Sequence, residues 1–309
     1  MQGKASTQTA EAEHVLLEPP FEVDVVLTLL PFRAGPCDPT FAVEGATVWR
    51  AVPTDEGSAT VRVRPVGGAI EATAWGLGRH AALTRLPALL GFEDDDRAFV
   101  AHHEVVRRAR RQFCGARLGR GRGLIETLMA TVLEQKVTSD EAHRSWAALV
   151  HRYGDSAPGP RRLFVPPSPE RLADLPYPAW HPLGIERRRA DTIRRLCARA
   201  TRVRSLEGEP AAEARRVLEH FPGVGPWTSN SATLRSHGDT DAVVVGDYHL
   251  PHLVAFTLTG ARRGSDREML EHLEPYRGQR ARALRLLTLG GSYPSRRAPR
   301  ARRRSFVAI

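Results

Sequence analysis

A glycine-rich hairpin and an aspartate downstream of it are the strongest candidates for binding and catalysis in this 309-residue chain. The hairpin reads Pro-Gly-Val-Gly-Pro over residues 222–226 and separates two segments with helical patterning. Its glycines remove side chains from one face of the turn, and the amides of the turn and of the next helix's first turn lack carbonyl partners within a helix. Because the positive end of the helix dipole lies at the same place, the hairpin predicts a site for a large anion such as a phosphate group. The alternative is a tight turn between two helices with ordinary caps, and the hairpin motif alone does not decide between the two.

The aspartate is Asp247, which follows the second hairpin glycine by 22 residues in the stretch "VVVGDYHLPH" (243–252). An aspartate at this position caps the helix that it opens, and that is a sufficient reason for its presence. If the carboxylate also faces a cleft, it remains ionised at neutral pH and can stabilise an oxocarbenium-like cation or orient a water molecule toward it. His249 and His252 flank a proline and have no third ligand nearby, so we expect no metal bound by side chains.

Amphipathic helices must hold the hairpin and the aspartate in place. The stretch 123–154 has one apolar helical face, after which Ser139 or Asp140 offers a cap for a second helix. The apolar positions in these two helices are Leu124, Ile125, Leu128, Met129, Val132, Leu133, Trp146, Leu149 and Val150. Further helices are predicted over 186–203, 211–220, 226–236, 249–260 and 266–289. After residue 160, the strongest strand signal is "DAVVV" (241–245).

In the first 90 or so residues, the apolar side chains recur with a different spacing. Short β-branched segments with partial alternation are separated by turn residues and predict strands. These segments are "FEVDVVLTLL" (21–30), "FAVEGATVWRAV" (41–52), "SATVRVRPV" (58–66) and "AIEATAWG" (69–76). Residues 76–92 predict a helix or two. We therefore predict an α+β chain with a disordered N-terminus (1–17), a small β-rich N-terminal domain (18–95), an all-α domain (96–292) and a disordered arginine-rich tail (293–309).

Charge and cysteine content limit the possible partners. The net charge is +10, and residues 275–309 hold ten arginines and no acidic residue, so this end accounts for the whole excess. The tail could bind phosphates non-specifically or could only aid solubility, and charge alone does not decide between these. Cys37, Cys114 and Cys197 match no metal-binding spacing and predict buried or inert thiols. No apolar run reaches the length of a membrane helix and the start of the chain is polar, so we expect a cytoplasmic protein.

The hairpin and aspartate together resemble the helix-hairpin-helix (HhH-GPD) DNA glycosylase superfamily, most closely its 3-methyladenine DNA glycosylase II (AlkA-type) branch. The stretch "LIETLMATVLEQKVTSDEAHRSWAALVHRYG" (124–154) resembles the family's long helix and its "GQQV"-like turn. The stretch "LGIERRRADTIRRLCARA" (183–200) resembles the "LG…RA" helix that precedes the hairpin helix. The resemblance covers most of residues 20–290, and it implies a β-rich first domain followed by an all-α helix-hairpin-helix glycosylase domain.

The resemblance also implies roles for the residues that match its motifs. Asp247 matches the catalytic carboxylate, and Gln135 and Lys136 match a turn near the DNA and the lesion. Ser231 stands where relatives carry an aromatic residue in the second hairpin helix, and Tyr248 and Tyr276 are further candidates for contact with the lesion. The hairpin that grips the DNA backbone, and whose carbonyl oxygens could hold Na⁺ or K⁺, comprises Pro222, Gly223, Val224, Gly225, Pro226, Trp227 and Thr228.

One departure from the family bears on the reaction. Members that also cut the DNA strand carry a lysine two positions after the hairpin glycine, and here that position is Trp227. The chain has two lysines, Lys4 and Lys136, and neither matches the lyase position. The chain also lacks the four-cysteine cluster of the endonuclease III and adenine-mismatch branches.

The sequence therefore predicts a monofunctional glycosylase that flips a damaged base, an alkylated purine of the 3-methyladenine type, out of double-stranded DNA and leaves an abasic site. We expect a monomer that needs no cofactor and binds no membrane. One alternative is a helix-hairpin-helix protein that binds DNA structure without chemistry, for which Asp247 would be useless. The other is a glycosylase for oxidised or deaminated bases, which would prefer uncharged lesions or show lyase activity.

Overall fold

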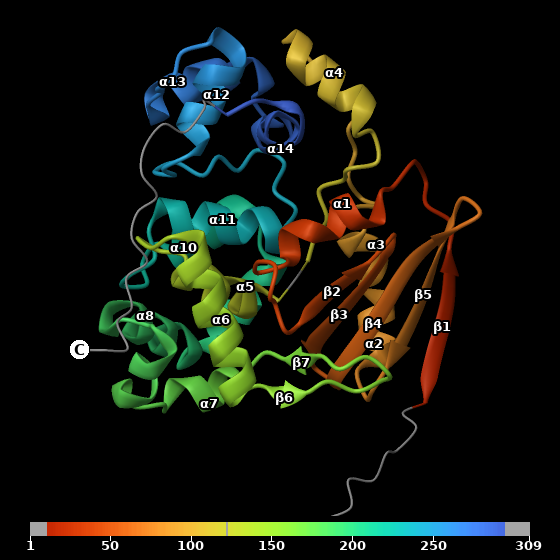
Figure 1. Cartoon of the computed structure of the whole chain (residues 1–309), viewed down its shortest axis with the longest axis vertical. Helices are drawn as coiled ribbons and strands as arrows, with labels where there is room; N and C mark the ends of the chain where they lie inside the picture. Colours follow the sequence, from red (N-terminus) through yellow and green to blue (C-terminus); the bar gives the residue numbers. More distant parts are fainter. Residues whose placement is uncertain (1–10, 122, 294–309) are drawn as a thin grey trace, which may run out of the picture.

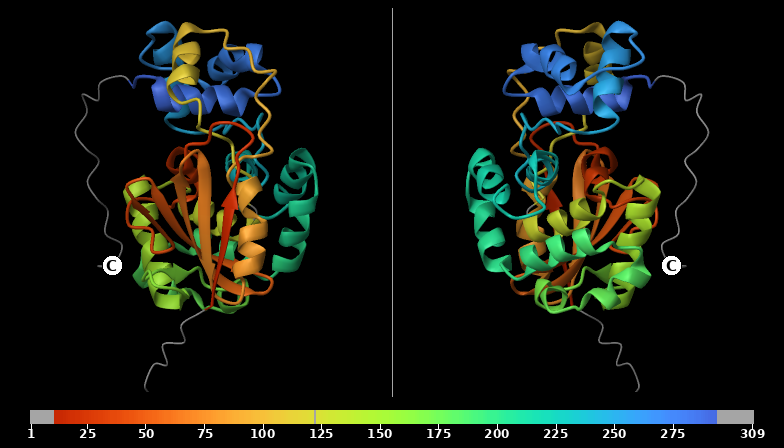
Figure 2. Two further views of the ribbon diagram at one scale, coloured as in Figure 1. Left: turned by 90° about the vertical axis from the view of Figure 1, so that its right-hand side faces the viewer. Right: turned by 90° about the vertical axis from the view of Figure 1, so that its left-hand side faces the viewer.

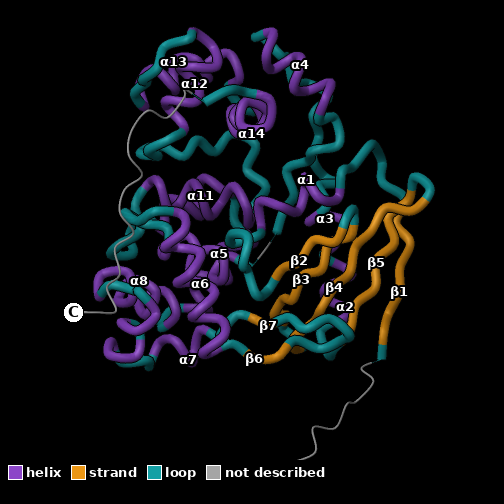
Figure 3. The backbone as a smooth tube through the Cα atoms, in the orientation of Figure 1, coloured by secondary structure: helices purple, strands orange, loops and turns teal. Residues whose placement is uncertain are grey.

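The computed structural model describes residues 11–121 and 123–293, which form a β-sheet unit beside two groups of helices (Figure 1). Figure 3 shows that the strands of the main sheet gather on one side of the molecule, with the short helices α1, α2 and α3 beside them, and that most of the other helices lie on the opposite side and above. None of the helices in the described part is long and apolar enough to cross a membrane. The predicted α+β class is confirmed.

The sheet is antiparallel with the strand order β1-β5-β4-β3-β2. Its strands are β1 (Ala12–Leu17), β2 (Phe41–Glu44), β3 (Thr47–Thr54), β4 (Gly57–Val66) and β5 (Ala69–Trp75). Val48 pairs with Val63, which pairs with Ala72 on the next strand, and all three side chains are buried. This apolar face packs with α2 (Arg79–Thr84) and α3 (Leu86–Leu89) in one core, as the alternation of side chains along strands requires.

The segment 21–30 was predicted as a strand, and this is wrong. It forms the helix α1 (Val25–Leu29) followed by the 3₁₀ turn η1 (Leu30–Phe32). The Asp24 side chain decides the local structure, because its Oδ1 accepts a hydrogen bond from the Leu27 amide at 2.8 Å and caps the helix. A run of β-branched and apolar residues resembles a strand until the capping residue is taken into account.

Two further predictions for this unit need correction. The segment 41–52 is not a single strand, because Gly45 adopts a left-handed conformation (φ 58°) and turns the chain from β2 into β3. The prediction that residues 1–17 are disordered is wrong for β1, which pairs along its whole length with β5. Residues 1–10 lie outside the described part of the chain.

The first group of helices, called here the hairpin lobe, consists of α5 to α11 around one hydrophobic core. The bounds are α5 (Leu124–Leu133), α6 (Ser139–Tyr153), α7 (Pro169–Ala173), α8 (Arg187–Cys197), α9 (Ala200–Ser205), α10 (Ala211–Leu218) and α11 (Pro226–Ser236). Shorter elements are β6 (Asp155–Ser156), β7 (Phe164–Val165), η2 (Tyr177–Ala179), η3 (His181–Leu183) and η4 (Leu206–Gly208). The apolar faces predicted for α5 and α6 are buried, which confirms them. The cap of α6 is Thr138 rather than Ser139 or Asp140, and its side chain accepts from the Glu141 amide.

The second group, called here the C-terminal lobe, combines segments that are far apart in the sequence. It contains α4 (Glu104–Gln112), α12 (Leu250–Thr259), α13 (Asp266–Leu273) and α14 (Arg280–Gly290). The yellow α4 lies beside the blue helices in all the views, and it shares a core with them (Figures 1 and 2). The helix predicted over 266–289 is interrupted by η5 (Glu274–Tyr276) and by Gly278 (φ 87°). The predicted strand 241–245 is wrong, because this segment is a buried connection without strand pairing.

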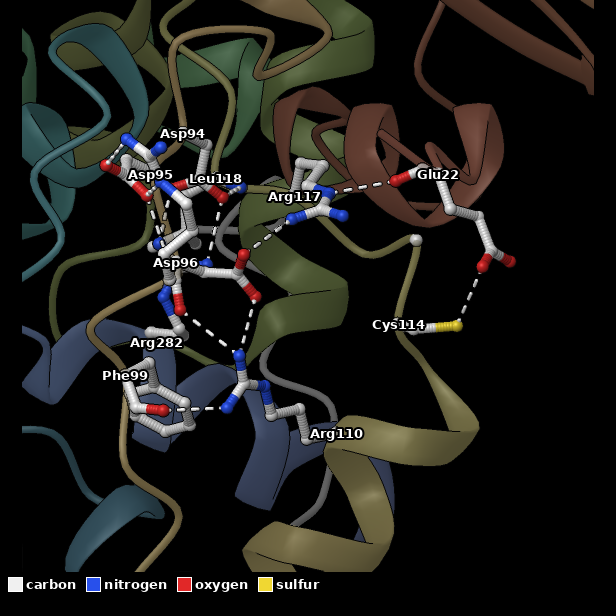
Figure 4. Close-up of polar contacts among 12 residues, drawn as sticks. Glu22, Asp94, Asp95, Asp96, Phe99, Arg110, Cys114, Arg117, Leu118 and Arg282 are labelled. Atoms are coloured by element: carbon white, nitrogen blue, oxygen red, sulfur yellow. Dashed lines mark hydrogen bonds and ion pairs between the residues drawn. The ribbon is translucent and has the colours of Figure 1, made fainter. Parts of the chain in front are cut away.

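A buried ion pair attaches the C-terminal lobe to the segments that lead into and out of α4 (Figure 4). Arg282 of α14 donates to both carboxylate oxygens of Asp94, and the two side chains are 6% and 1% exposed. The same carboxylate accepts from the Leu118 amide at 2.9 Å, so one acidic group fixes three parts of the chain. Arg117 adds a second bridge by pairing with Asp96 at 3.2 Å.

The cysteines agree only partly with the prediction of buried or inert thiols. Cys197 is buried in the hairpin lobe, and burial raises the pKa of its thiol to about 12. Cys37 and Cys114 are exposed, so burial does not apply to them and only the second alternative, an inert thiol, stays a prediction. The Cys114 thiol donates to the Glu22 carboxylate at 3.1 Å, and this hydrogen bond raises its pKa (Figure 4).

Replacing Arg282 with Met would leave the Asp94 carboxylate buried without its counter-charge. We expect the free energy of unfolding to fall by about 3–5 kcal/mol, measured by urea denaturation. Arg277→Met is the matched control, because Arg277 is 70% exposed and pairs with Glu274 at the surface. A loss below about 1 kcal/mol is expected there. Equal losses in the two variants would contradict the role given to the buried pair.

Candidate active site

The predicted hairpin is present between α10 and α11. The Val224 amide donates to the Phe221 carbonyl at 2.9 Å and closes the turn, and the Val224 side chain is buried in the hairpin lobe. Pro226 occupies the first turn of α11, where its missing amide hydrogen and fixed φ suit a helix start. Pro222 and Gly223 remain exposed. The turn is therefore anchored in the core of the hairpin lobe through Val224 and exposed to solvent at Pro222 and Gly223.

The two hairpin glycines serve different purposes. Gly223 has a φ of 98°, and a Cβ placed there would lie 2.1 Å from Thr192 Oγ1 of α8, so only glycine lets the turn rest on that helix. Gly225 has an extended backbone, and a Cβ placed there would meet no atom within 4 Å. Within the described residues, the amides of Gly223, Gly225 and Trp227 have no hydrogen-bond partner. These donors, together with the helix dipole of α11, can bind an anion.

Gln135 ties the turn after α5 to the hairpin. Its Nε2 donates to the Gly223 carbonyl at 2.9 Å and to Thr228 Oγ1 at 2.8 Å, so it holds both the hairpin and the first turn of α11. The next residue, Lys136, is exposed and has a φ of 56°, which makes it the one non-glycine residue in the described part of the chain with a positive φ. The structure thus brings this turn to the hairpin and places a lysine charge beside it.

Asp247 lies between the hairpin and α12. Its Oδ1 accepts from the amides of His249 and Leu250 at 2.7 and 2.9 Å. The predicted cap needs correction, because the N-cap residue of α12 is His249, and Asp247 binds the start of the helix from two residues further back. Its Oδ2 accepts from the Trp227 indole Nε1 of the hairpin helix at 3.2 Å. Three donors therefore fix the carboxylate beside the hairpin, and a carboxylate with about four acceptor positions keeps room for one more partner.

The loop that carries Asp247 is anchored at both ends. Before it, Asp241 Oδ1 accepts from the Gly278 amide and from Arg280 Nε, each at 2.8 Å. Next to it, the Gly246 amide donates to Asp266 Oδ2 at 3.0 Å. Sequence reasoning missed these contacts, because each one joins residues at least 20 positions apart and leaves no local signal.

The other predicted contact residues lie in different surroundings. Tyr248 is 78% exposed next to Asp247, and its ring stands edge-on to the His249 ring at 5.0 Å. Ser231 is 8% exposed and lies one helical turn after Trp227 on the same face of α11. Tyr248 thus offers a large free surface beside the carboxylate, whereas Ser231 offers little.

The prediction that Tyr276 lies near the lesion or the DNA is wrong. Its ring is 3% exposed in the core of the C-terminal lobe and stacks on Phe99 with 5.7 Å between ring centroids. Its hydroxyl accepts from the His103 amide at 3.0 Å. A buried tyrosine with a satisfied hydroxyl is a packing residue.

A separate cavity of about 120 Å³ lies between the sheet and α5. Arg50 and Glu126 line it, whereas the hairpin residues and Asp247 do not. Burial raises the pKa of Glu126 and lowers that of Arg50 to about 10. The cavity is therefore a different place from the site around Asp247.

Comparisons with known proteins identify relatives of this fold. No family model matches the chain. It is 28% identical over 149 residues to DNA-3-methyladenine glycosylase 2 of Escherichia coli K12, a match that spans 47% of this chain and 51% of that enzyme. The chain thus matches about half the length of that curated relative.

Two solved structures have a similar fold along nearly the whole chain. A 3-methyladenine DNA glycosylase from Archaeoglobus fulgidus matches with a TM-score of 0.77 and 20% identity, covering 89% of this chain and 97% of that one. The apo form of an 8-oxoguanine glycosylase/lyase from Clostridium acetobutylicum matches with a TM-score of 0.70 and 11% identity, covering 92% and 99%.

The two hairpin glycines allow a matched test of the geometry. Gly223→Ala should lower the free energy of unfolding by about 1–3 kcal/mol, because the new methyl group meets Thr192 and the backbone conformation becomes strained. Gly225→Ala should change it by less than about 0.5 kcal/mol, because the position is open and its φ suits alanine. Urea denaturation of both variants checks this, and an equal effect would show that the hairpin does not rest on α8.

Proposed function

We propose that this chain, which has the fold of the helix-hairpin-helix DNA glycosylases, is a monofunctional DNA glycosylase of base-excision repair. Its substrate is double-stranded DNA with a damaged base, an alkylated purine of the 3-methyladenine type, and its product is an abasic site. The observation that carries the proposal is the hydrogen bond from Trp227 to Asp247, because it brings an anion-binding turn and a carboxylate to one place.

The hairpin supplies the contact with DNA. The free amides of Gly223, Gly225 and Trp227 suit a backbone phosphate, which gives affinity and register but no sequence choice. The carbonyl oxygens of Phe221 and Gly223 each accept one hydrogen bond and keep a second lone pair. Neutral oxygen donors of this kind fit Na⁺ or K⁺, and such an ion would add positive charge beside the phosphate.

Asp247 supplies the charge for the chemical step. When the bond from C1′ to the base nitrogen breaks, its electron pair leaves with the base and the sugar becomes an oxocarbenium-like cation. The carboxylate stabilises this cation, and a water molecule then adds to C1′ and releases a proton. An alkylated cationic base leaves as a neutral molecule, so the reaction needs no general acid on the base and no cofactor.

The residue at the lyase position supports hydrolysis without strand cleavage. Trp227 has no nucleophilic amine, and Lys136 is the one lysine among the described residues. Lys136 follows α5 rather than the hairpin. Lys4 lies outside the described part of the chain. We therefore propose a monomer that acts on DNA in the cytoplasm and leaves the sugar–phosphate strand intact.

The residue at position 231 favours a second candidate function, which is a glycosylase for oxidised or deaminated bases. Ser231 stands where the family resemblance implies an aromatic residue, and a hydroxyl cannot stack on a cationic base. The similarity to an 8-oxoguanine glycosylase/lyase also leaves the base open. A DNA binder without chemistry is disfavoured, because a carboxylate beside a polyanion lowers affinity.

Asp247→Asn should lower single-turnover release of free base from methylated duplex DNA by about 100-fold or more, with binding of undamaged duplex retained. The matched control is Glu213→Gln, which removes the same charge from an exposed pair with Arg216 on α10. Strand breaks should appear only after alkali treatment. Full base release by the Asp247 variant would contradict the catalytic role, and no release by the unmodified protein would contradict the alkylated substrate.

A further inference from the structure

Arginines line the face of α8 on which the hairpin rests. Arg188, Arg195 and Arg199, called here the arginine face, are spaced i, i+7 and i+11, so they lie within roughly 60° of one another around the helix axis. Arg199 follows the end of α8, where Ala198 still has a helical conformation. Thr192 lies on the same face between Arg188 and Arg195, and it is buried where Gly223 packs over it. The arginine face therefore flanks the hairpin along α8.

These arginines are exposed, and none of the three forms an ion pair within the described residues. The acidic residues of α8 and its cap have other partners. Glu186 pairs with Arg189 at 3.7 Å and Asp191 pairs with Arg194 at 3.5 Å. On the hairpin side, Glu219 accepts a hydrogen bond from Ser229 Oγ at 2.7 Å. The arginine face thus keeps its charge uncompensated beside the anion-binding amides.

The extent of this positive surface exceeds a single phosphate site. From Arg188 to Arg199 the helix rises by about 16 Å at 1.5 Å per residue. This length corresponds to roughly five base-pair steps of B-DNA at 3.4 Å per step. Lys136 adds a further positive charge to the surroundings of the hairpin, because its neighbour Gln135 is bonded to the Gly223 carbonyl.

We propose that the arginine face is a second contact with the DNA backbone, which continues the phosphate track of the hairpin along α8. Its guanidinium groups neutralise phosphates and release counterions, so it binds damaged and undamaged duplex equally and takes no part in the choice of base. The inference rests on the proposed function because it takes duplex DNA as the partner. It does not depend on the catalytic step.

The test is the salt dependence of binding to an undamaged DNA duplex, measured by fluorescence anisotropy over a series of KCl concentrations. The double variant R188Q/R195Q loses two phosphate contacts, so the slope of log K against log salt should become less steep by about 1.8. The matched control is R64Q/R79Q, which removes two arginines that pair with Glu71 and Glu11 in the β-sheet unit. The control slope should stay within about 0.3 of the unmodified protein's.

Single-turnover base release at saturating protein separates this inference from the proposed function. If the slope of log K against log salt becomes less steep in R188Q/R195Q while base release at saturating protein is unchanged, the arginine face binds DNA and acts before the chemical step. If the slope becomes less steep but the unmodified protein releases no base from methylated duplex DNA, the arginine face stands and the assignment of an alkylated substrate fails. An unchanged slope, or equal changes in the two double variants, would contradict the proposed contact between the arginine face and DNA, whatever the base-release activity.

Discussion

The buried pair between Asp94 and Arg282 is the interaction on which the geometry of the candidate site depends. Asp247 belongs to the C-terminal lobe, whereas the anion-binding turn belongs to the hairpin lobe. The direct bond between them, from Trp227 to Asp247, is a single hydrogen bond of 3.2 Å between partly exposed groups. The position of the C-terminal lobe is therefore set by the chain segments that enter and leave it. Asp94 joins two of these segments to α14: the one that arrives from the β-sheet unit and the one that leads on to α5.

In the proposed glycosylase, this arrangement separates affinity from chemistry. The hairpin offers uncharged amides, which suit a phosphate of any nucleotide, and the carboxylate comes from a different segment. A negative charge placed close to bound DNA costs affinity, and here three donors from His249, Leu250 and Trp227 hold that charge in a fixed position. A preorganised carboxylate needs no rearrangement when positive charge develops on the sugar, which is the condition for effective electrostatic catalysis.

The sequence predicted the parts of the fold that local chemistry determines. The faces of α5 and α6 follow from their helical period, and the hairpin follows from its glycines and prolines. Within segment 21–30, the helix α1 forms because the Asp24 cap outweighs the strand-like composition. Segment 241–245 is buried but pairs with no strand. The ion pair of Asp94 with Arg282 joins residues 188 positions apart, so no local pattern could reveal it. Tyr276 was misplaced for a related reason, because an aromatic residue gives the same signal in a core and in a binding site.

In the proposed function, Asp247 recognises positive charge on the sugar of a nucleotide held by the hairpin. The most direct measurement is the ratio of the Kd values for two duplexes, one with a neutral abasic analogue and one with a cationic azasugar at the same position. We expect the unmodified protein to bind the cationic analogue more tightly and Asp247→Asn to bind both analogues alike. An undiminished preference for the cationic analogue in Asp247→Asn would contradict it, because the charge would then be recognised elsewhere.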